Sequence, residues 1–451
     1  MADREVVHVV GAGFAGAACA LKLADAGRRV VLWEAGAAPG GRAISRRDPE
    51  SNEVLDNGPH LFMDCYDHAR GVLKRLGTDN LLAFQDRLHI PVMDGGRRLA
   101  LSCPQLPGPL HLVAGLLGLG GSGLVGRVRA LVAGDRLKSV DPRVDETVAD
   151  YLARVGAPAA SVRVLWDPLC RAVMNLALTE AAAGPFVAAL RIALLQGPRR
   201  ARLGWARVGL GELFAPLGKE LAEAGGELRR GRVRRISVDP DGAVAGIEGP
   251  DHQTHAVRRV VIAADPWNAA LMLNSCGGAA SLAVEVGECG KSSIVSVYYW
   301  LDRQAVVFDR LSPFIGFSAA PASQGGGAEW VFDRDRLEGL PPGTGQRLVT
   351  ITSAAEPLMG PRRAEVAATV WRSLVAEFPE LRRARILRSK VIKEGRSTPR
   401  LMPGTSRPAP GAVPRVPGLF LCGDLTDTGL PATMEAAALS GEVAAARVLD
   451  D

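Results

Sequence analysis

The feature that most constrains this chain is a glycine-rich turn at residues 11–16, Gly-Ala-Gly-Phe-Ala-Gly, which lies between an apolar segment and a helical pattern. Residues 6–10 read Val-Val-His-Val-Val, and such a run of β-branched residues is typical of a strand buried in a parallel sheet. The alanine- and leucine-rich residues 15–26 predict the helix. The sequence therefore predicts that the chain opens with a strand–turn–helix unit of an α/β fold.

The spacing of the three glycines in this turn matches the fingerprint of dinucleotide binding. Gly11 permits the tight turn, Gly13 lets the backbone approach a pyrophosphate, and Gly16 lets the helix pack closely on the strand. The free N–H groups at the start of the helix attract the phosphates. We expect the whole turn to contact the cofactor, through Gly11, Ala12, Gly13, Phe14, Ala15 and Gly16.

An acidic residue follows the second predicted strand, residues 28–33, at the distance that the fingerprint requires. Glu34 is placed to accept hydrogen bonds from the ribose hydroxyls of an adenosine, and we expect its neighbour Ala35 beside the same group. A negative charge at this position repels a 2′-phosphate. The unit therefore disfavours an NADP-type cofactor.

A second glycine-rich segment, Gly40-Gly41-Arg42-Ala43, extends this unit. The paired glycines allow a close approach of the backbone, and Arg42 supplies a charged donor to a phosphate. The segment resembles the glycine-rich extension of the flavin amine oxidase and phytoene desaturase superfamily. This resemblance implies that the cofactor is FAD, with the residues of this segment beside its pyrophosphate and ribityl chain.

Near the end of the sequence, a predicted strand at residues 418–422 leads through Gly423-Asp424 into an alanine-rich helix. The string resembles the C-terminal FAD motif of the same superfamily, in which the Asp binds the ribityl or phosphate region and the helix start faces the flavin ring. A helix N-terminus stabilises the negative charge of a reduced flavin. The resemblance implies cofactor contacts from Gly423, Asp424, Pro431, Ala432, Thr433 and Met434.

Three further segments look like parts of the same cofactor domain. Residues 231–236 resemble the family's strand that places a backbone contact, here from Val233, on the adenine. Residues 258–264 resemble the strand that returns the chain to the nucleotide sheet, which implies contacts from Ala263 and Ala264. The loop Asp56-Asn-Gly-Pro-His60 is expected near the flavin ring, with contacts from Gly58, Pro59 and His60.

A chain of 451 residues is long enough for two joined domains. The resemblance implies an α/β fold, in which a Rossmann-like FAD-binding domain related to that of glutathione reductase is combined with an interleaved α+β substrate domain of mixed sheet and helices. We expect the FAD-binding domain to be discontinuous, over residues 1–60, 205–270 and 390–451. The substrate domain then takes residues 61–204 and 271–389.

Composition and charge limit the classes of binding partner that we expect for this protein. The net charge of +6 suits an acidic surface, but no basic run is interleaved with aromatic residues, so we expect no nucleic-acid partner. The seven cysteines are widely spaced without a CxxC pair, which predicts neither a disulfide framework nor a bound metal. No signal-peptide pattern is visible at the start. We expect a cytoplasmic protein, with peripheral contact to the inner face of the cell membrane as a further expectation.

The segment 99–126 contains no Lys, Arg, Asp or Glu. Its density of glycine and proline disfavours a stable spanning helix. Three interpretations stay open: a segment that contacts the membrane, a wall of an apolar substrate channel, and an ordinary buried helix pair. Basic residues that suit an anchor against anionic lipid follow it, namely Arg127, Arg129, Arg136 and Lys138.

Several shorter motifs point to one branch of the superfamily. Over nearly its full length the chain resembles the squalene-associated branch, hydroxysqualene dehydroxylase. The motifs that carry this resemblance are Asp56-Asn-Gly-Pro-His60-Leu, Leu106-Pro-Gly-Pro-Leu-His-Leu, Trp166-Asp-Pro-Leu-Cys170 with Asn175, Gly209-Leu-Gly-Glu-Leu-Phe214, Trp330-Val-Phe-Asp-Arg334 and Thr428-Gly-Leu-Pro-Ala-Thr433. One departure is Pro59, where the family usually carries Gln and carotenoid desaturases carry Pro.

The resemblance implies removal of the hydroxyl of hydroxysqualene, with hydride delivered from reduced flavin to an allylic cation, in squalene and hopanoid biosynthesis. The substrate is then a long isoprenoid, and the electron donor is not identified. An acid must protonate the departing hydroxyl. His60 and Asp56 are the candidates. For Asp56 a structural role in the turn is preferred, whereas for His60 both acid catalysis and flavin contact stay open.

Three alternatives remain at this stage. A carotenoid-type desaturase, favoured by Pro59, runs the flavin oxidatively. An amine oxidase is less favoured, because that class oxidises a soluble amine in an aromatic cage and aromatic residues make up only 5% of this chain. A non-catalytic FAD- or lipid-binding partner of neighbouring enzymes is the third.

Overall fold

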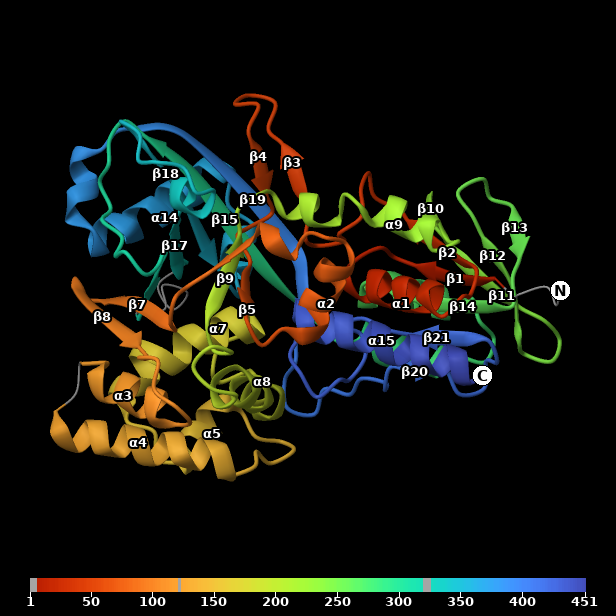
Figure 1. The fold of residues 1–451 in the computed structure, drawn as a ribbon, viewed down its shortest axis with the longest axis horizontal. Coiled ribbons are helices and arrows are strands. Elements are labelled where there is room, and N and C mark those ends of the chain that lie inside the picture. The colour runs from red at the N-terminus through yellow and green to blue at the C-terminus, as the bar shows by residue number, and fades with distance from the viewer. Residues whose placement is uncertain (1–5, 121–122, 319–325) are drawn as a thin grey trace.

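The computed structural model describes residues 6–120, 123–318 and 326–451. Two lobes are visible side by side in Figure 1, and both chain ends lie on the lobe that carries β1, β2 and α15. The strand β19 (Ile386–Pro399) runs from the second lobe toward the first. The fold is mixed α/β, as predicted.

The first lobe is built on a six-stranded sheet with the order β10-β2-β1-β14-β21-β20. All neighbouring pairs in it are parallel except β20–β21. The strands come from widely separated parts of the sequence: β1 (Val7–Val10), β2 (Val30–Glu34), β10 (Glu227–Arg230), β14 (Arg259–Ile262), β20 (Gly411–Ala412) and β21 (Leu419–Leu421). Because the main strands are parallel, the segments that follow them meet at one edge of the sheet.

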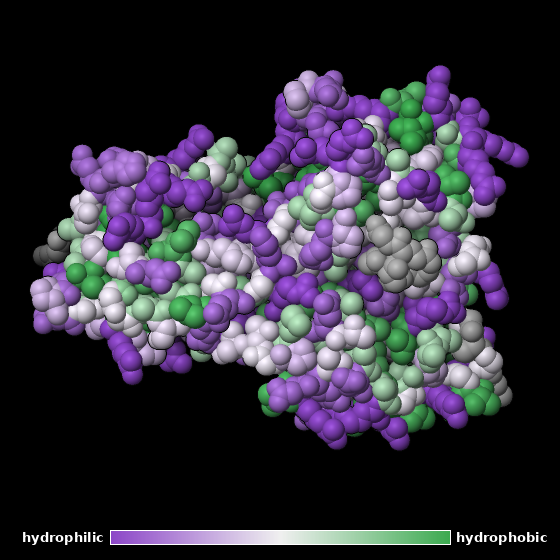
Figure 2. Space-filling model, turned by 180° about the vertical axis from the view of Figure 1, so that it is seen from behind, coloured by the Kyte–Doolittle hydropathy of each residue, from purple (hydrophilic) through white to green (hydrophobic). Residues whose placement is uncertain are grey.

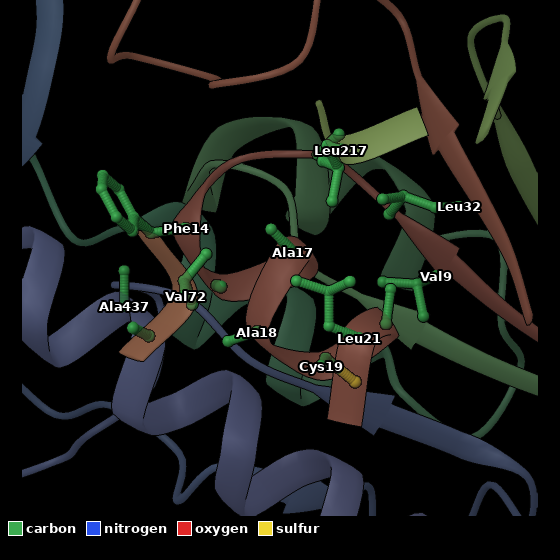
Figure 3. Packing of buried hydrophobic residues seen from close by; sticks show 14 of the residues in the cluster. Val9, Phe14, Ala17, Ala18, Cys19, Leu21, Leu32, Val72, Leu217 and Ala437 are labelled. Atoms are coloured by element: carbon green, nitrogen blue, oxygen red, sulfur yellow. The ribbon is translucent and has the colours of Figure 1, made fainter. Parts of the chain in front are cut away.

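Helices cover one face of this sheet: α1 (Phe14–Asp25), α2 (Asp67–Arg75), α9 (Leu217–Glu223) and α15 (Met434–Asp450). Figure 3 shows small side chains of α1, among them Ala17 and Ala18, packed between Val9, Leu32 and the C-terminal helix. A Cβ on Gly441 of α15 would lie 2.1 Å from the carbonyl oxygen of Ala15, so the two helices approach closely only because that residue is glycine.

A small antiparallel sheet and two helices cover the opposite face. They are β11 (Arg235–Val238), β12 (Val244–Glu248), β13 (Thr254–Ala256), α10 (Pro266–Leu273) and α11 (Ala280–Gly287). The strand predicted at residues 231–236 is wrong in its bounds, because β10 ends at Arg230 and β11 begins at Arg235. Val233 therefore lies in the connection between two strands, where its backbone is free of ladder hydrogen bonds.

The second lobe is built on a seven-stranded mixed sheet with the order β19-β15-β18-β17-β16-β7-β8. Besides β19, its strands are β7 (His89–Asp94), β8 (Arg97–Ser102), β15 (Lys291–Leu301), β16 (Phe314–Phe317), β17 (Trp330–Asp333) and β18 (Gln346–Thr352). The alternate side chains Val295, Val297, Tyr299 and Leu301 form one apolar face of β15, which packs against the layer that holds α14 (Arg363–Glu377).

Helices pack on the other face of this sheet: α3 (Leu110–Gly118), α4 (Leu124–Ser139), α5 (Val148–Arg154), α6 (Ala159–Ser161), the π-helix η2 (Val162–Trp166), α7 (Asp167–Met174) and α8 (Ala183–Leu195). Residues 145–176 thus contain two longer helices, α5 and α7, with α6 and η2 between them. Pro168 falls in the first turn of α7, where its missing N–H costs no hydrogen bond.

The segment 99–126 begins in β8 and continues through α3 into α4, and residues 121 and 122 of it lie outside the described residues. Of the described helices, none combines the length and the apolar character that crossing a membrane requires. The remaining short elements are β3 (Ser45–Arg47), β4 (Val54–Asp56), β5 (Leu61–Met63), η1 (Asp79–Leu81), β6 (Leu82–Phe84), β9 (Leu203–Ala206) and η3 (Leu210–Phe214). Three more connect elements within the second lobe: α12 (Arg334–Leu337), α13 (Glu356–Met359) and η5 (Pro379–Arg383).

Candidate functional site

One large cavity, of about 1150 Å³, is lined by residues from both lobes. Sites for one drug-sized ligand typically measure about 300–1,000 Å³, so this cavity has room for a large cofactor and a second molecule. We call one part of this cavity the cofactor half. It is lined by the start of α15 and by the segments that follow β1, β2, β10, β14 and β21. We call the other part the apolar half, which is lined by α7, α8 and the facing side chains of the seven-stranded sheet.

The structure brings nearly all the predicted cofactor residues to the cofactor half. Gly16 alone among them is not part of its lining. Those that line it are Gly11, Ala12, Gly13, Phe14, Ala15, Glu34, Ala35, Gly40, Gly41, Arg42, Ala43, Gly58, Pro59, His60, Val233, Ala263, Ala264, Gly423, Asp424, Pro431, Ala432, Thr433 and Met434.

The glycines of the first turn are required by packing. Gly11 has φ +111°, and a Cβ there would lie 2.6 Å from the carbonyl oxygen of Ala263. A Cβ on Gly16 would lie 1.7 Å from the carbonyl oxygen of Gly11, so Gly16 acts by letting helix and strand pack together. This packing role explains why Gly16 does not line the cavity.

The start of α1 fits a pyrophosphate. Its N-cap is Gly13, which has no side chain to accept a hydrogen bond from the first turn. The nearest atom to a Cβ built on Gly13 is the Cα of Gly41 at 3.7 Å, so the two glycine-rich segments leave an open cradle. Uncapped N–H groups at a helix start that faces a cavity are an anion site, which is what the phosphates of FAD need.

Glu34 ends β2 at the edge of this cradle. Its carboxylate accepts hydrogen bonds from the N–H of Ala12 at 3.0 Å and from the N–H of Gly36 at 2.5 Å. These two bonds fix the direction of the side chain, which also lines the cavity. The carboxylate is thus held in a fixed direction at the edge of the cavity.

Arg42 lies at the centre of the cofactor half. Its Nη2 is 2.7 Å from Oδ2 of Asp424, and its Nη1 donates to the carbonyl oxygen of Ser397 at 2.6 Å. The pair joins the segment predicted from the N-terminal motif to the one predicted from the C-terminal motif. Arg42 is anchored by the protein itself, and it remains part of the cavity wall.

The two predicted acid candidates lie in different places. His60 lines the large cavity, and its Nδ1 is 2.8 Å from the carbonyl oxygen of Gly58. Burial lowers the pKa of His60 below its ordinary value, and the positive charge of Arg42 acts in the same direction. A neutral imidazole that donates from Nδ1 to Gly58 leaves Nε2 as an acceptor.

Asp56 instead lines a separate cavity of about 340 Å³, which His60 and Pro59 also border. Its Oδ1 accepts hydrogen bonds from the Ser45 hydroxyl at 2.5 Å and from the Leu210 N–H at 3.0 Å. Burial raises the pKa of Asp56 to about 6, although these two hydrogen bonds oppose the rise. The carboxylate holds the loop that carries His60 against its neighbours.

The apolar half is built from side chains that the sequence did not single out. Its walls include Leu169 and Val173 of α7, Leu190, Ile192 and Leu194 of α8, and Leu88, Ile90, Leu101, Trp330, Phe332 and Ile351 from the facing sheet. A few polar residues, Asn175, Ser353 and Thr398, interrupt this lining. Leu169, Asn175, Trp330 and Phe332 lie in motifs that resemble the squalene-associated branch, and Leu101 lies in the segment 99–126, but the other lining residues carried no local signal. Leu101 is the only residue described within 99–126 that lines the large cavity.

The described residues contain no group of three or more His, Cys, Asp or Glu side chains arranged to hold a metal ion. All seven cysteines are buried free thiols.

Comparisons with known proteins agree with this site. A family model described as flavin containing amine oxidoreductase matches residues 14–449. The chain is 28% identical to a hydroxysqualene dehydroxylase of Rhodopseudomonas palustris, over 99% of this chain and 98% of the relative. It is also 25% identical to a zeta-carotene desaturase of Zea mays, over 96% of this chain and 82% of the relative.

Among solved structures, an oxidoreductase from Methanosarcina mazei has a similar fold. Its TM-score to this chain is 0.74 at 17% sequence identity, with 99% of this chain and 100% of the other covered. At this identity the likeness supports the fold and not a substrate.

Proposed function

The chain belongs to the flavin containing amine oxidoreductase family, and on that premise we propose that it is a hydroxysqualene dehydroxylase, which converts hydroxysqualene to squalene in squalene and hopanoid biosynthesis. The protein is an FAD-dependent oxidoreductase. The observation that carries the proposal is the continuity of the cavity: one space of about 1150 Å³ joins the cofactor half to the apolar half. The full-length similarity to hydroxysqualene dehydroxylases supports hydroxysqualene as the isoprenoid that the apolar half binds.

We propose that the FAD is held by the residues that line the cofactor half. The uncapped start of α1 and the Gly40-Gly41 segment take the pyrophosphate, Glu34 the ribose, and Val233 the adenine. Thr433 and Met434 at the start of α15 face the flavin ring. When bound, FAD supplies a two-electron hydride donor or acceptor. The domain division into 1–60, 205–270 and 390–451 against 61–204 and 271–389 is part of this proposal.

The apolar half has the task of binding the isoprenoid and excluding water. Each CH₂ group of a hydrocarbon that leaves water is worth about 0.8 kcal/mol, so a long apolar wall supplies most of the binding free energy. Dry walls also strengthen the electrostatic interactions of the few polar groups present. The isoprenoid is therefore held by α7 and α8, while its one hydroxyl must find a polar partner.

For the acid candidates, we propose different tasks. His60 contacts the flavin ring, because it lines the large cavity and its lowered pKa leaves it neutral near pH 7. Asp56 supports the His60 loop through its bonds to Ser45 and Leu210. Replacement of His60 should therefore alter the flavin spectrum, and replacement of Asp56 should alter loop stability.

We further propose that the protein is cytoplasmic and contacts the inner face of the membrane through α3 and α4. Their exposed apolar side chains are Leu110 (54% exposed), Val125 (69%), Val128 (51%) and Val132 (47%). Basic residues lie between them on α4, among them Arg127 and Arg129, and would meet anionic lipid. On the lower right of Figure 2, over the lobe that carries these helices, hydrophobic residues lie among hydrophilic ones. α4 also packs against α8, a wall of the apolar half.

The direct test is expression beside an enzyme that forms hydroxysqualene, followed by mass spectrometry of the extracted lipids. The proposal expects squalene to appear only when both proteins are present. A matched control is the Gly11→Val variant, which should lose FAD and make none. Persistence of hydroxysqualene with soluble, FAD-loaded protein would contradict the proposal.

A carotenoid-type desaturase is the second candidate, favoured by Pro59 and by the similarity to a zeta-carotene desaturase. It predicts new double bonds in a supplied polyene and no squalene. The same lipid extraction from cells that make phytoene separates the two candidates.

A further inference from the structure

A buried polar cluster lies behind the apolar wall of the large cavity, where α7 meets the ends of β17, β18 and β19. Its members are Arg171, Asn175, Glu329, Ser353 and Thr398. Asn175, Ser353 and Thr398 line the cavity, whereas Glu329 is only 3% exposed and lies directly behind Ser353. Burial of a carboxyl group in an otherwise apolar wall is costly, and the proposed function as stated gives this group no task.

Glu329 is hydrogen-bonded to a residue of the cavity wall. Its Oε2 accepts a hydrogen bond from the Ser353 N–H at 2.8 Å, and Ser353 lines the cavity. Its Oε1 is 3.5 Å from Nη1 of Arg171. Arg171 is shared, because its Nε also lies 3.2 Å from Oδ1 of Asp167. Because the guanidinium is shared between two carboxyl groups, it offsets only part of the cost of burying a negative charge on Glu329.

Three charged or titratable groups of α7 face Glu329, namely Arg171, Asp167 and the thiol of Cys170. Burial raises the pKa of Glu329 to about 7, Arg171 and the Ser353 hydrogen bonds oppose the rise, and Asp167 adds to it. Glu329 therefore carries its proton below about pH 7 and loses it above. A carboxyl group with such a pKa beside a cavity is suited to proton transfer.

The backbone around Ser353 is held in an unusual conformation. Ala354 has φ +45° and Asn175 has φ +52°, both in the left-handed region. The Ala354 N–H donates to Oδ1 of Asn175 at 2.8 Å, and Nδ2 of Asn175 donates to Oγ1 of Thr398 at 3.0 Å. At Ala354 this conformation costs about 1–2 kcal/mol, and strain of this kind is concentrated at functional sites, whereas Asn175 is the C-cap of α7, where Asn adopts the left-handed region readily.

The cluster lies near the loop expected to face the flavin ring. Across the sheet, Ser296 pairs with Ile351, and Ile351 with Trp330. The Ser296 hydroxyl donates to the carbonyl oxygen of Asn57 at 2.9 Å, beside Gly58. Ser353 follows two residues after Ile351. The Trp330 indole N–H, also in the cavity wall, has no hydrogen-bond partner among the described residues.

We propose that Glu329, acting through the Ser353 hydroxyl, supplies the proton that converts the substrate hydroxyl into a departing water molecule. The inference rests on the proposed dehydroxylation. Ser353 donates its proton to the substrate oxygen and takes the proton of Glu329. The C–O bond breaks with its electron pair on oxygen, so water leaves and the carbon becomes an allylic cation. FAD, when bound in its reduced form, would supply the hydride that the cation needs, and a proton from solvent returns the Glu329 carboxylate to its acid form.

The test is the pH dependence of single-turnover squalene formation by the reduced holoenzyme. In the wild type the rate should be full below about pH 7 and fall as the pH rises through that value, because the acid is lost. Glu329→Gln keeps the shape of the side chain but removes the acidic proton. A positioned acid typically raises the rate of a reaction by about 10²–10⁴-fold. The rate of the variant should therefore fall at least about 100-fold and should no longer depend on pH in this range. Ser353→Ala should behave similarly, and Ser353→Thr should recover part of the rate.

The matched control is Asp333→Asn. Asp333 is a buried carboxyl group at the other end of the same strand, caps α12, and lines neither cavity. Its variant should keep the wild-type pH profile. Two results would overturn the inference. One is that Asp56→Asn, and not Glu329→Gln, abolishes the pH dependence of the rate. The other is a rate of Glu329→Gln within about twofold of the wild-type rate. Failure of the wild type itself to form squalene would instead overturn the proposed function.

A second readout needs no substrate and covers the case in which Glu329→Gln does not fold. In infrared difference spectra of the wild-type holoenzyme during a pH titration, a protonated-carboxyl band should disappear near pH 7. Deuterium exchange and Ser353→Ala should both shift that band. A spectrum without any carboxyl group that titrates near neutrality would contradict the inference.

Discussion

The two halves of the large cavity are made in different ways. The cofactor half is lined by backbone and glycine at the ends of parallel strands, and its shape depends on turns within a few residues of each strand. The apolar half is lined by side chains from α7, α8 and one face of a mixed sheet, which come together only in the folded chain. A cofactor site can thus be fixed by local geometry, whereas the substrate site depends on long-range packing.

The largest expected effect is in the cofactor half. Gly11→Val adds a branched side chain at φ +111°, where even a Cβ would lie 2.6 Å from the carbonyl oxygen of Ala263. We expect complete loss of bound FAD, measured by the flavin absorbance of the purified protein. Gly184→Ala is the control, because Gly184 of α8 has open space around it, and this variant should bind FAD fully. Full FAD binding by Gly11→Val would break the comparison.

A smaller effect is expected in the apolar half. Ala189→Phe places a ring in the wall contributed by α8 and reduces the space for the isoprenoid. Overpacking typically costs about 1–3 kcal/mol, so kcat/KM should fall about 5- to 150-fold while the FAD content stays unchanged. Loss of FAD together with activity would show that the two halves are not independent.

The motifs of the cofactor half could be predicted because each is local. Glu34 and the glycines at 11, 13, 40 and 41 act through the strand–turn–helix geometry that surrounds them in the sequence, and that geometry can be inferred from a single segment. Val233 lines the cofactor half even though the strand predicted over residues 231–236 has the wrong bounds, because Val233 lies in the connection between β10 and β11.

The apolar half could not be predicted in the same way. Leu190 and Ile351 are ordinary apolar residues of a helix and a strand, and no local pattern distinguishes a cavity wall from a packed core. The pairing of Glu329 with Arg171 joins residues 158 positions apart. Such contacts follow from the relative placement of α7 and β17, which the sequence pattern does not specify.

The membrane surface provides a third and smaller effect. Val125→Asp combined with Val128→Asp places two charges among the exposed apolar residues of α4. We expect several-fold weaker sedimentation with vesicles of anionic lipid, and slower turnover of vesicle-borne substrate with unchanged turnover in detergent. The exposed Val307→Asp, away from α3 and α4, is the control. Equal vesicle binding by all three proteins would refute the membrane proposal.

The smallest effect is expected for Trp330→Phe. The change removes the indole N–H that lacks a partner among the described residues and keeps an aromatic wall. A neutral hydrogen bond is worth about 0.5–1.5 kcal/mol, so loss of one to the substrate oxygen should raise KM about 2- to 12-fold. An unchanged KM would mean that this N–H does not meet the substrate.

The most direct test of the central claim, that one cavity brings FAD and a hydroxylated isoprenoid together for reduction, is an anaerobic single turnover. The enzyme is reduced stoichiometrically with dithionite and then mixed with hydroxysqualene, while the flavin absorbance is followed and the product is extracted. We predict that the oxidised flavin spectrum returns and that one squalene forms per FAD. A flavin that stays reduced beside unchanged hydroxysqualene would contradict the account.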